Sequence, residues 1–231
     1  MSGVIESDLE VLFEDNHLLV VHKPAGLVTM GAPAGGPSLV EQARAYVRRK
    51  YDKPGKVYLG IVSRLDAVAS GVIVLARTSK AARRLTDLFG GGGVEKTYWA
   101  VTGAVVQPDV GVCHDWLRKY EPRQRTVVAR AGQAGAREAR LAYRTLRRVS
   151  AGSALEISLA TGRKHQIRVQ LAHRGWPLLG DRKYGSRTPF DPGIALHARR
   201  LAFEHPVRKI PLAFEAPLPP SWGRFGLDRL G

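Results

Sequence analysis

The stretch Ser63-Arg64-Leu65-Asp66-Ala67-Val68-Ala69-Ser70-Gly71 leads directly into an apolar run at residues 72–76. A short apolar run of this kind is typical of a buried β-strand. Residues 57–62, on the other side of the stretch, also have strand composition. We therefore expect Asp66 to lie at a turn between two strands, where its carboxylate can face a cleft.

The rest of the chain reads as short strands with a few helices between them. Strands are expected at residues 11–13 and 18–21, forming a hairpin, and at 96–106, 137–149, 154–160, 201–204 and 212–215. Ser38 and Glu41 have the form of a capping box, which predicts a helix to about Lys50. A second helix is expected from Thr78 or Ser79 to the glycines at 90–93, and a third at 165–173. This pattern predicts an α+β fold built on a mixed, mostly antiparallel sheet with flanking helices.

Composition limits the class of protein. With 231 residues and 44% hydrophobic side chains, the chain is long enough to form one sizeable domain over residues 1–231. Cys113 is the sole cysteine, which excludes an internal disulfide and favours a reducing compartment. No signal-peptide pattern and no apolar run near the roughly 20 residues of a membrane span are found, so we expect a cytoplasmic protein. The histidine spacing does not fit a zinc-binding helix, and no metal is expected.

The charge is strongly positive and unevenly distributed. Lys and Arg number 36 against 20 Asp and Glu, a formal net charge of +16. Residues 1–60 hold seven basic and seven acidic side chains, whereas residues 118–148 hold ten and two, and residues 163–209 hold eleven and three. Such a localised excess favours a polyanionic partner such as RNA. A generally basic surface without a specific partner is the simpler alternative.

Asp66 by itself has two interpretations. A carboxylate next to an arginine at a turn is most often an ion pair or a turn cap. The functional alternative is a nucleophile, because a carboxylate held beside a reacting carbon can form a covalent intermediate. Asp181, between Gly180 and Gly185, is the nearest rival, and its flanking glycines and cations favour a structural turn. Paired-carboxylate glycoside hydrolysis has little support, since no second acidic residue lies in the segments around Asp66 or Arg168.

Several segments, taken together and in order, resemble the RluA-type RNA pseudouridine synthases. Val21-His22-Lys23-Pro24-Ala25-Gly26-Leu27 is similar to the first motif of that family, and Arg64-Leu65-Asp66 with Ser70-Gly71 is similar to its catalytic motif. Further matches are Lys96-Thr97-Tyr98-Trp99-Ala100, Thr161-Gly162-Arg163-Lys164-His165-Gln166-Ile167-Arg168-Val169, the segment 180–185, and Leu196-His197-Ala198 with residues 203–206. The resemblance extends from about residue 10 to residue 217.

The resemblance implies a fold with a central active-site cleft and a catalytic set of Asp66, Tyr98 and Arg168. Asp66 would be the nucleophile in converting uridine to pseudouridine, without a cofactor. Arg168 would pair with Asp66, because a nearby cation favours the ionised carboxylate. Tyr98 would stack on the uracil and serve in proton transfer from carbon 5; a half-buried strand tyrosine is its ordinary alternative.

Four further residues are implied to bind RNA: Arg64, Arg163, Lys164 and His165. An enzyme that acts on a base in folded RNA must extrude the nucleotide, and Arg64, beside the nucleophile, would fill the vacated stack. A plain phosphate contact is the alternative for Arg64. Arg163, Lys164 and His165, at a loop before a helix, suit phosphate contacts.

The sequence departs from many relatives at Ser63, where they have histidine, and at Ala69, where they have threonine. These changes affect the expected pocket and RNA choice and leave the catalytic pair in place. The small N-terminal RNA-binding domain of some relatives is not expected, because the first motif lies close to Met1. No coiled coil or dimer motif is found, which favours a monomer.

Two other functions compete with an enzyme acting on ribosomal or transfer RNA. The glycines before Lys96-Thr97 suggest a phosphate-binding loop, but Glu95 stands where that loop requires glycine. A non-catalytic RNA-binding or RNA-chaperone relative explains the charge equally well. Asp66, Tyr98 and Arg168 discriminate between them, since RNA binding alone does not require that set.

Overall fold

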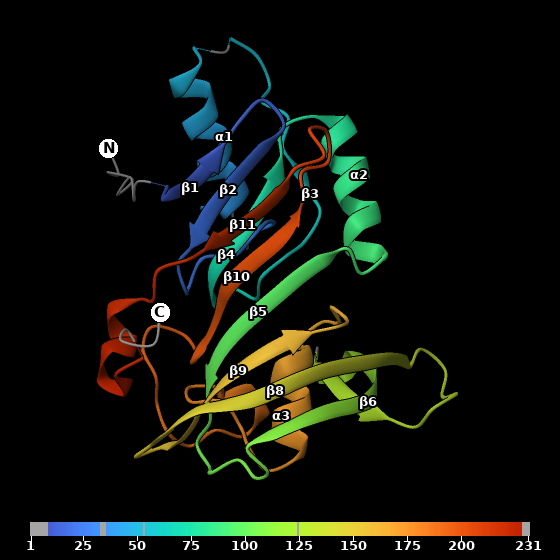
Figure 1. The fold of residues 1–231 in the computed structure, drawn as a ribbon, viewed down its shortest axis with the longest axis vertical. Helices are drawn as coiled ribbons and strands as arrows, with labels where there is room; N and C mark the ends of the chain where they lie inside the picture. The colour runs from blue at the N-terminus through green and yellow to red at the C-terminus, as the bar shows by residue number, and fades with distance from the viewer. Residues whose placement is uncertain (1–8, 33–35, 53, 124, 228–231) are drawn as a thin grey trace.

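A single mixed sheet carries the fold (Figure 1). The computed structural model describes residues 9–32, 36–52, 54–123 and 125–227. The strands follow the order β1-β2-β4-β10-β5-β9-β8-β6-β7, with β3 paired to β4 and β11 to β10. Their bounds are β1 Val11–Glu14, β2 Leu18–Lys23, β3 Gly60–Ile61, β4 Ser70–Ala76, β5 Val94–Val101, β6 Val110–Tyr120, β7 Arg125–Ala129, β8 Arg137–Val149, β9 Gly152–Leu159, β10 Leu196–Glu204 and β11 Pro211–Glu215. The mixed, mostly antiparallel α+β architecture is confirmed.

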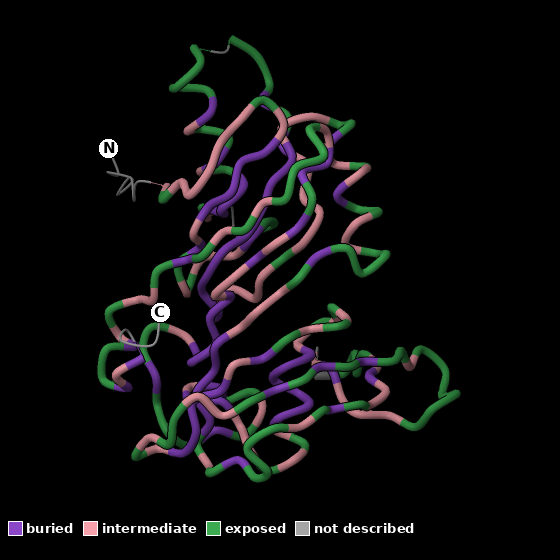
Figure 2. The backbone as a smooth tube through the Cα atoms, viewed as in Figure 1, coloured by how far each residue is buried: buried purple, intermediate pink, exposed green. Residues whose placement is uncertain are grey.

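Strands β2 and β4 are buried on both faces because a helix covers each side. Side chains alternate along a strand, so Leu19 and Val21 face α1 (Leu39–Lys50), and Leu18 and Val20 face α2 (Ser79–Gly90). These strands form much of the continuous buried path in Figure 2. The stretch that contains Asp66 therefore leads into one of the most buried parts of the molecule.

The second half of the sheet, β9-β8-β6-β7, is covered on one face by α3 (Gln166–His173). Ile167 and Leu171 of α3 pack into a core with Leu141 of β8 and Ile157 of β9. Val169 contacts a smaller cluster formed by Leu117 and Ala139. This packing fixes the helix that carries Arg168.

A parallel pair of strands lies beside the loop that carries Asp66. Strand β4 pairs in parallel with β10, placing Gly71 opposite Ala198. Gly71 has φ +124°, and a Cβ there would lie 2.3 Å from the Ala198 carbonyl oxygen, so this close approach requires glycine. The neighbouring Ser70 hydroxyl forms a buried 2.8 Å hydrogen bond with His197 Nδ1. The start of β4 is thereby held against the last third of the chain.

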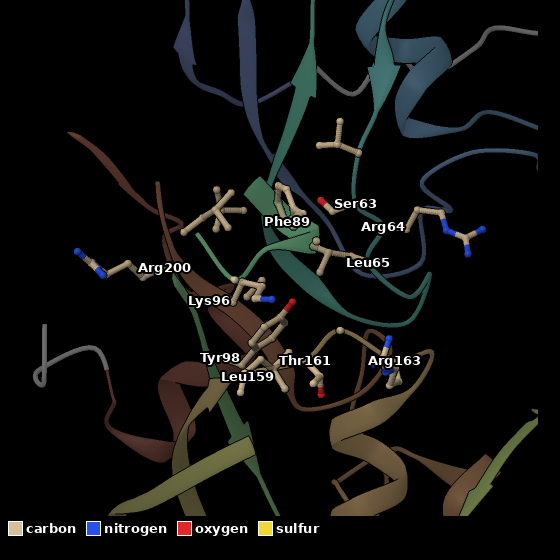
Figure 3. Close-up of a pocket in the computed structure, with 18 of the residues that line it drawn as sticks. Ser63, Arg64, Leu65, Phe89, Lys96, Tyr98, Leu159, Thr161, Arg163 and Arg200 are labelled. Carbon is tan, nitrogen blue, oxygen red and sulfur yellow. The ribbon is translucent and has the colours of Figure 1, made fainter. Parts of the chain in front are cut away.

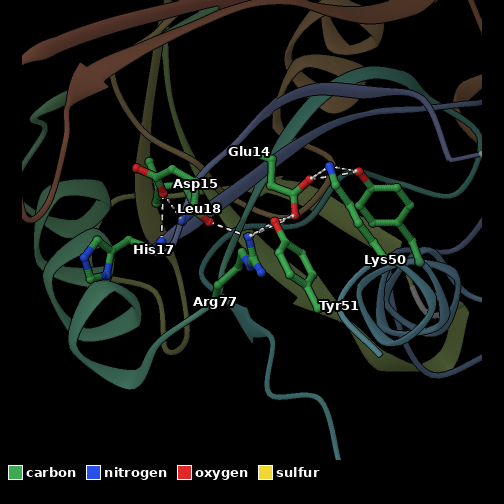
Figure 4. A network of polar contacts seen from close by, with 8 residues as sticks. Glu14, Asp15, His17, Leu18, Lys50, Tyr51 and Arg77 are labelled. Carbon is green, nitrogen blue, oxygen red and sulfur yellow. Dashed lines mark hydrogen bonds and ion pairs between the residues drawn. The ribbon is translucent and has the colours of Figure 1, made fainter. Parts of the chain in front are cut away.

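A polar network ties α1 to the edge of the sheet (Figure 4). The Glu14 carboxylate accepts hydrogen bonds from Lys50 at 2.7 Å, from Tyr51 at 2.8 Å and from Arg77 at 2.9 Å. Burial acts to raise the pKa of Glu14, but these donors outweigh it and the pKa is lowered. The network lies at the other end of β4 from the Asp66 loop and is structural.

The predicted elements agree with the structure with a few exceptions. Helix α1 has the predicted capping box at Ser38, and Thr78 caps α2. The strand expected at 57–62 is limited to β3, and the strand expected at 96–106 ends at Val101. Strands β6 and β7 were not predicted. None of the helices in the described parts of the chain has the length and apolar character needed to span a bilayer.

Candidate active site

Asp66 lies in the loop between β3 and β4, as predicted, and binds Arg168. Arg168 Nη1 donates a 2.8 Å hydrogen bond to Asp66 Oδ2. The Arg168 side chain is 6% exposed, whereas that of Asp66 is 26% exposed. The cation is thus part of the protein interior, and the carboxylate is accessible from the cleft.

Arg168 is held in place by a second carboxylate. Its Nε and Nη2 donate to the two oxygens of Asp181 at 2.7 and 2.9 Å. Burial acts to lower the pKa of Arg168, but the bonds to Asp181 and Asp66 outweigh it and raise that pKa. The guanidinium is therefore a fixed positive charge, and its planar geometry allows it to bridge both carboxylates.

His165 lies beside Asp66 in a constrained position. Its backbone is left-handed, with φ 55°, at the residue before α3. Nε2 is 3.7 Å from Asp66 Oδ1, and Nδ1 is 2.7 Å from the Tyr184 hydroxyl. That hydroxyl also accepts a 3.0 Å bond from the Thr126 backbone N–H. A carboxylate beside Nε2 favours the tautomer with its proton there, so Tyr184 donates to Nδ1.

Burial lowers the pKa of His165 to about 4, against the opposing effect of the Asp66 charge. At neutral pH the imidazole is uncharged. His165 is therefore a neutral neighbour of the nucleophile candidate, and its expected phosphate contact stays a prediction.

Tyr98 projects from β5 into the same pocket as Asp66. The pocket is narrow, about 70 Å³, and its apolar walls include Leu159, Ile167 and Leu196. Burial raises the pKa of the Tyr98 phenol, and the Asp66 charge adds to this effect. A neutral aromatic ring on an apolar pocket wall provides a stacking surface for a planar base.

Lys23 and Thr29, at and after the end of β2, hold the backbone of the loop that carries Asp66. The fully buried amine of Lys23 donates to the carbonyls of Pro24 at 2.7 Å, Leu27 at 2.8 Å and Ala67 at 3.3 Å. The Thr29 hydroxyl donates to the Leu65 carbonyl at 2.9 Å. Both residues adjacent to Asp66 are therefore anchored.

The remaining predicted RNA-binding residues lie around the mouth of the pocket. Arg64 is exposed and points away from Tyr98 (Figure 3). Arg163 Nε donates to the Glu138 carbonyl at 2.8 Å, and its side chain lines the cleft. Lys164 is exposed beside it. The structure thus brings Asp66, Tyr98 and Arg168 together and places Arg64, Arg163 and Lys164 at the rim.

Three residues of the site have no role predicted from the sequence. Asp181 does lie in a turn, as expected, but it is also the buried partner of Arg168. Tyr184 and Lys23 lie within the quoted motifs and were given no role. A buried lysine or aspartate has no local sequence signal, because its partner is far away in the chain. Among the described residues, no group of histidine, cysteine, aspartate and glutamate is arranged to hold a metal ion.

Comparison with known proteins points to one family. The model of the RNA pseudouridylate synthase family matches residues 17–173. The chain is 34% identical over 226 residues to the ribosomal large subunit pseudouridine synthase D of Pseudomonas aeruginosa, covering 92% of this chain and 69% of that protein. It is 36% identical over 215 residues to YlyB, an uncharacterised RNA pseudouridine synthase of Bacillus subtilis, covering 92% and 70%.

The fold is similar as well. The solved structure of human RNA pseudouridylate synthase domain containing 4 superposes with a TM-score of 0.77 at 25% identity, over 94% of this chain and 93% of that one. The family match extends over β2 to α3 and so includes Asp66, Tyr98 and Arg168. The resemblance read from the sequence is confirmed: the chain belongs to the RluA-type RNA pseudouridine synthases and is an isomerase that acts on RNA.

Proposed function

We propose that the protein converts specific uridines of ribosomal RNA to pseudouridine, with Asp66 as the nucleophile, after the target nucleotide has been flipped out of its stack. The ribosomal substrate is suggested by the name of the Pseudomonas relative, a ribosomal large subunit pseudouridine synthase. Transfer RNA is the second substrate class to be tested. The observation that best supports the catalytic assignment is the pairing of Asp66 with Arg168. Asp66 is partly exposed to the cleft, and the buried carboxylate of Asp181 holds Arg168 in position.

The reaction is an isomerisation that consumes no co-reactant. The bond from the ribose C1′ to uracil N1 breaks, and a bond from C1′ to C5 forms. The C5 proton is lost and N1 gains a proton, so the atoms balance. Asp66 would supply the nucleophilic oxygen, and Arg168 would keep it ionised and oriented.

Tyr98 is assigned to stacking on the uracil. Its phenol is neutral at physiological pH, and burial, which raises the pKa, disfavours ionisation further. An aromatic side chain under a nucleobase contributes on the order of 1 to 3 kcal/mol. Extrusion of a nucleotide costs a few kcal/mol, so such a contact offsets a large part of that cost.

Arg64, Arg163 and Lys164 are assigned to the RNA around the target. Arg64 and Arg163 line both the Asp66 pocket and the wider cavities on its two sides. Contacts of this kind release counterions from RNA, so affinity should fall steeply with salt. A salt-independent affinity would contradict this part of the proposal.

The test replaces Asp66 with Asn in cells and maps pseudouridine in ribosomal and transfer RNA by chemical labelling and primer extension. We expect one or a few sites to be lost while RNA binding by the purified variant is retained. Asp87→Asn, an exposed carboxylate on α2, is the matched control and should leave the map unchanged. If the pseudouridine map is unchanged in the Asp66→Asn variant, the catalytic proposal is overturned and a non-catalytic RNA-binding protein is favoured.

A further inference from the structure

A second cavity adjoins the Asp66 pocket (Figure 3). It has a volume of about 450 Å³ and lies between the end of α2, strands β5 and β10, and the loop after β9. This volume is in the range of sites that hold small organic molecules. Tyr98 and Leu159 line both this cavity and the Asp66 pocket. The two spaces are therefore neighbours that share a wall.

The chemistry of the cavity is divided between cations and apolar side chains. The described residues that line it include no carboxylate. Its cations are Arg64, Lys96, Arg163 and Arg200, and its apolar side chains are Val62, Leu65, Val72, Phe89, Leu159 and Leu201. The cations can bind a phosphate, and the apolar side chains can pack against a nucleobase. A nucleotide contains both groups.

Lys96 differs from Arg163 and Arg200 in its partners, and from Arg64 in being half-buried where Arg64 is exposed. Arg200 is paired with Glu95 at 3.0 Å, and Arg163 donates to a backbone carbonyl at 2.8 Å. The Lys96 amine has no hydrogen bond or ion pair with any of the residues that the structure describes. Burial lowers its pKa, with no opposing partner. A half-buried ammonium without a partner is costly in the free protein, and an anion in the cavity would relieve that cost.

The position of Lys96 is set by the strand. Lys96 and Tyr98 are two residues apart on β5, so both side chains project from the same face of the sheet. Figure 3 shows both residues extending into the cavity region, with Phe89 at the end of α2 beside them. A uridine stacked on Tyr98 would lie beside this cavity, because Tyr98 lines both the cavity and the Asp66 pocket.

We infer that the cavity is a binding site for the nucleotide adjacent to the target uridine, with a phosphate on the Lys96 amine and its base against Phe89. This inference rests on the proposed function, because it takes the uridine on Tyr98 as its starting point. The enzyme would then hold two successive nucleotides away from the helix stack, and the shape of the cavity would contribute to the choice of target sequence.

The test for the phosphate contact uses a synthetic RNA hairpin that contains a mapped target uridine. Affinity is measured by fluorescence anisotropy with Asp66→Asn protein, so that no turnover occurs. On the native hairpin we expect Lys96→Met to weaken binding about tenfold, because a charge-assisted hydrogen bond is lost. A neutral methylphosphonate at one of the two linkages flanking the uridine should remove that difference, and Lys96→Arg should restore binding.

Lys80→Met is the matched control, since Lys80 is an exposed lysine on α2 outside the cavity. It should weaken binding less than Lys96→Met, and no single neutral linkage next to the uridine should cancel its effect. Equal losses for Lys96→Met on native and on both substituted hairpins would overturn the phosphate contact. Thermal unfolding of each variant establishes that the fold is retained.

A separate variant tests the proposed contact between the neighbouring base and Phe89. Phe89→Leu keeps an apolar side chain and removes the aromatic face, so we expect about a fivefold loss of affinity on the native hairpin. The loss should vanish on a hairpin that has an abasic nucleotide at the neighbouring position. The same loss on both hairpins would contradict a base at Phe89. Failure of the wild-type protein to form pseudouridine in the hairpin would count against the proposed function, whereas the affinity pattern tests the cavity.

Discussion

Asp181 binds the Arg168 guanidinium through both carboxylate oxygens, at 2.7 and 2.9 Å, and leaves Nη1 for Asp66. The orientation of the nucleophile candidate therefore depends on a residue that does not reach the cleft. Asp181 is 1% exposed, so it acts on the reaction only through Arg168.

We expect Asp181→Asn to lower kcat about 100-fold with little change in KM, because Arg168 loses its fixed position. The free energy of unfolding should fall by about 3 kcal/mol or more, since a buried ion pair is broken. Single-turnover kinetics and urea unfolding measure the two effects. Asp115→Asn, which breaks the Asp115–Arg174 pair, is the control and should reduce stability while kcat stays near the wild-type value. An unchanged kcat in Asp181→Asn would show that Arg168 needs no second carboxylate.

Tyr184→Phe should reduce both stability and rate by removing one hydroxyl. The change leaves the Thr126 N–H and His165 Nδ1 without their partner, at a cost of about 1 to 3 kcal/mol in the free energy of unfolding. His165 has a pKa of about 4, so the variant should lower the rate by a similar factor at every pH from about 6 to 8. Tyr120→Phe, at an exposed tyrosine, should change neither quantity. A rate loss confined to one end of this range would contradict a neutral His165.

Lys23 should make stability depend on pH in the alkaline range. Burial lowers its pKa from 10.5 to about 8, with the Asp66 charge opposing. Between these values the unfolded chain binds more protons than the folded chain, so the Lys23 contribution to stability rises with pH. Urea unfolding from about pH 8 to 10 should show the wild type gaining stability relative to Lys23→Met. Parallel pH curves for the two proteins would show that the amine is not perturbed in solution.

Gly71→Ala should prevent stable folding. An added Cβ would lie 2.3 Å from the Ala198 carbonyl oxygen and 2.4 Å from its nitrogen, and neither backbone atom can move away without breaking the pairing of β4 with β10. We expect a loss of more than about 4 kcal/mol in the free energy of unfolding, which is exceptional for one residue. Gly55→Ala, where a Cβ meets open space, should be nearly neutral. A well-folded Gly71→Ala protein in urea unfolding would contradict the close approach.

The sequence predicts an element well when the residues that define it are close together in the chain. The Ser38–Glu41 capping box marks the start of α1. Strand β6 was missed because its exposed valines, Val110 and Val112, and its charged residues do not give a regular alternation. This segment forms a strand because it pairs with β8, and the residues of the segment alone do not reveal that pairing.

The proposed catalytic set rests on the family resemblance, and the structure shows why residue patterns alone were insufficient. Asp66 and Arg168 are 102 positions apart, so their 2.8 Å contact is a product of the whole fold. His165 lies beside Asp66, and burial lowers the pKa of its imidazole, so any contact of His165 with RNA would use the neutral ring. The RNA-binding roles of Arg64, Arg163, Lys164 and His165 stay predictions.

The parallel pairing of β4 with β10 also sets the order in which the enzyme can mature during synthesis. Ser70 and His197, which meet across this pair, are separated by 127 positions. At an intermediate length, a ribosome-bound chain has already exposed Asp66, Tyr98 and Arg168. It still lacks β10, the strand that pairs with the start of β4 just after the Asp66 loop. The nascent polypeptide therefore carries every proposed catalytic side chain before its active site has formed. We expect the chain to become able to catalyse the reaction only after β10 has emerged from the ribosome.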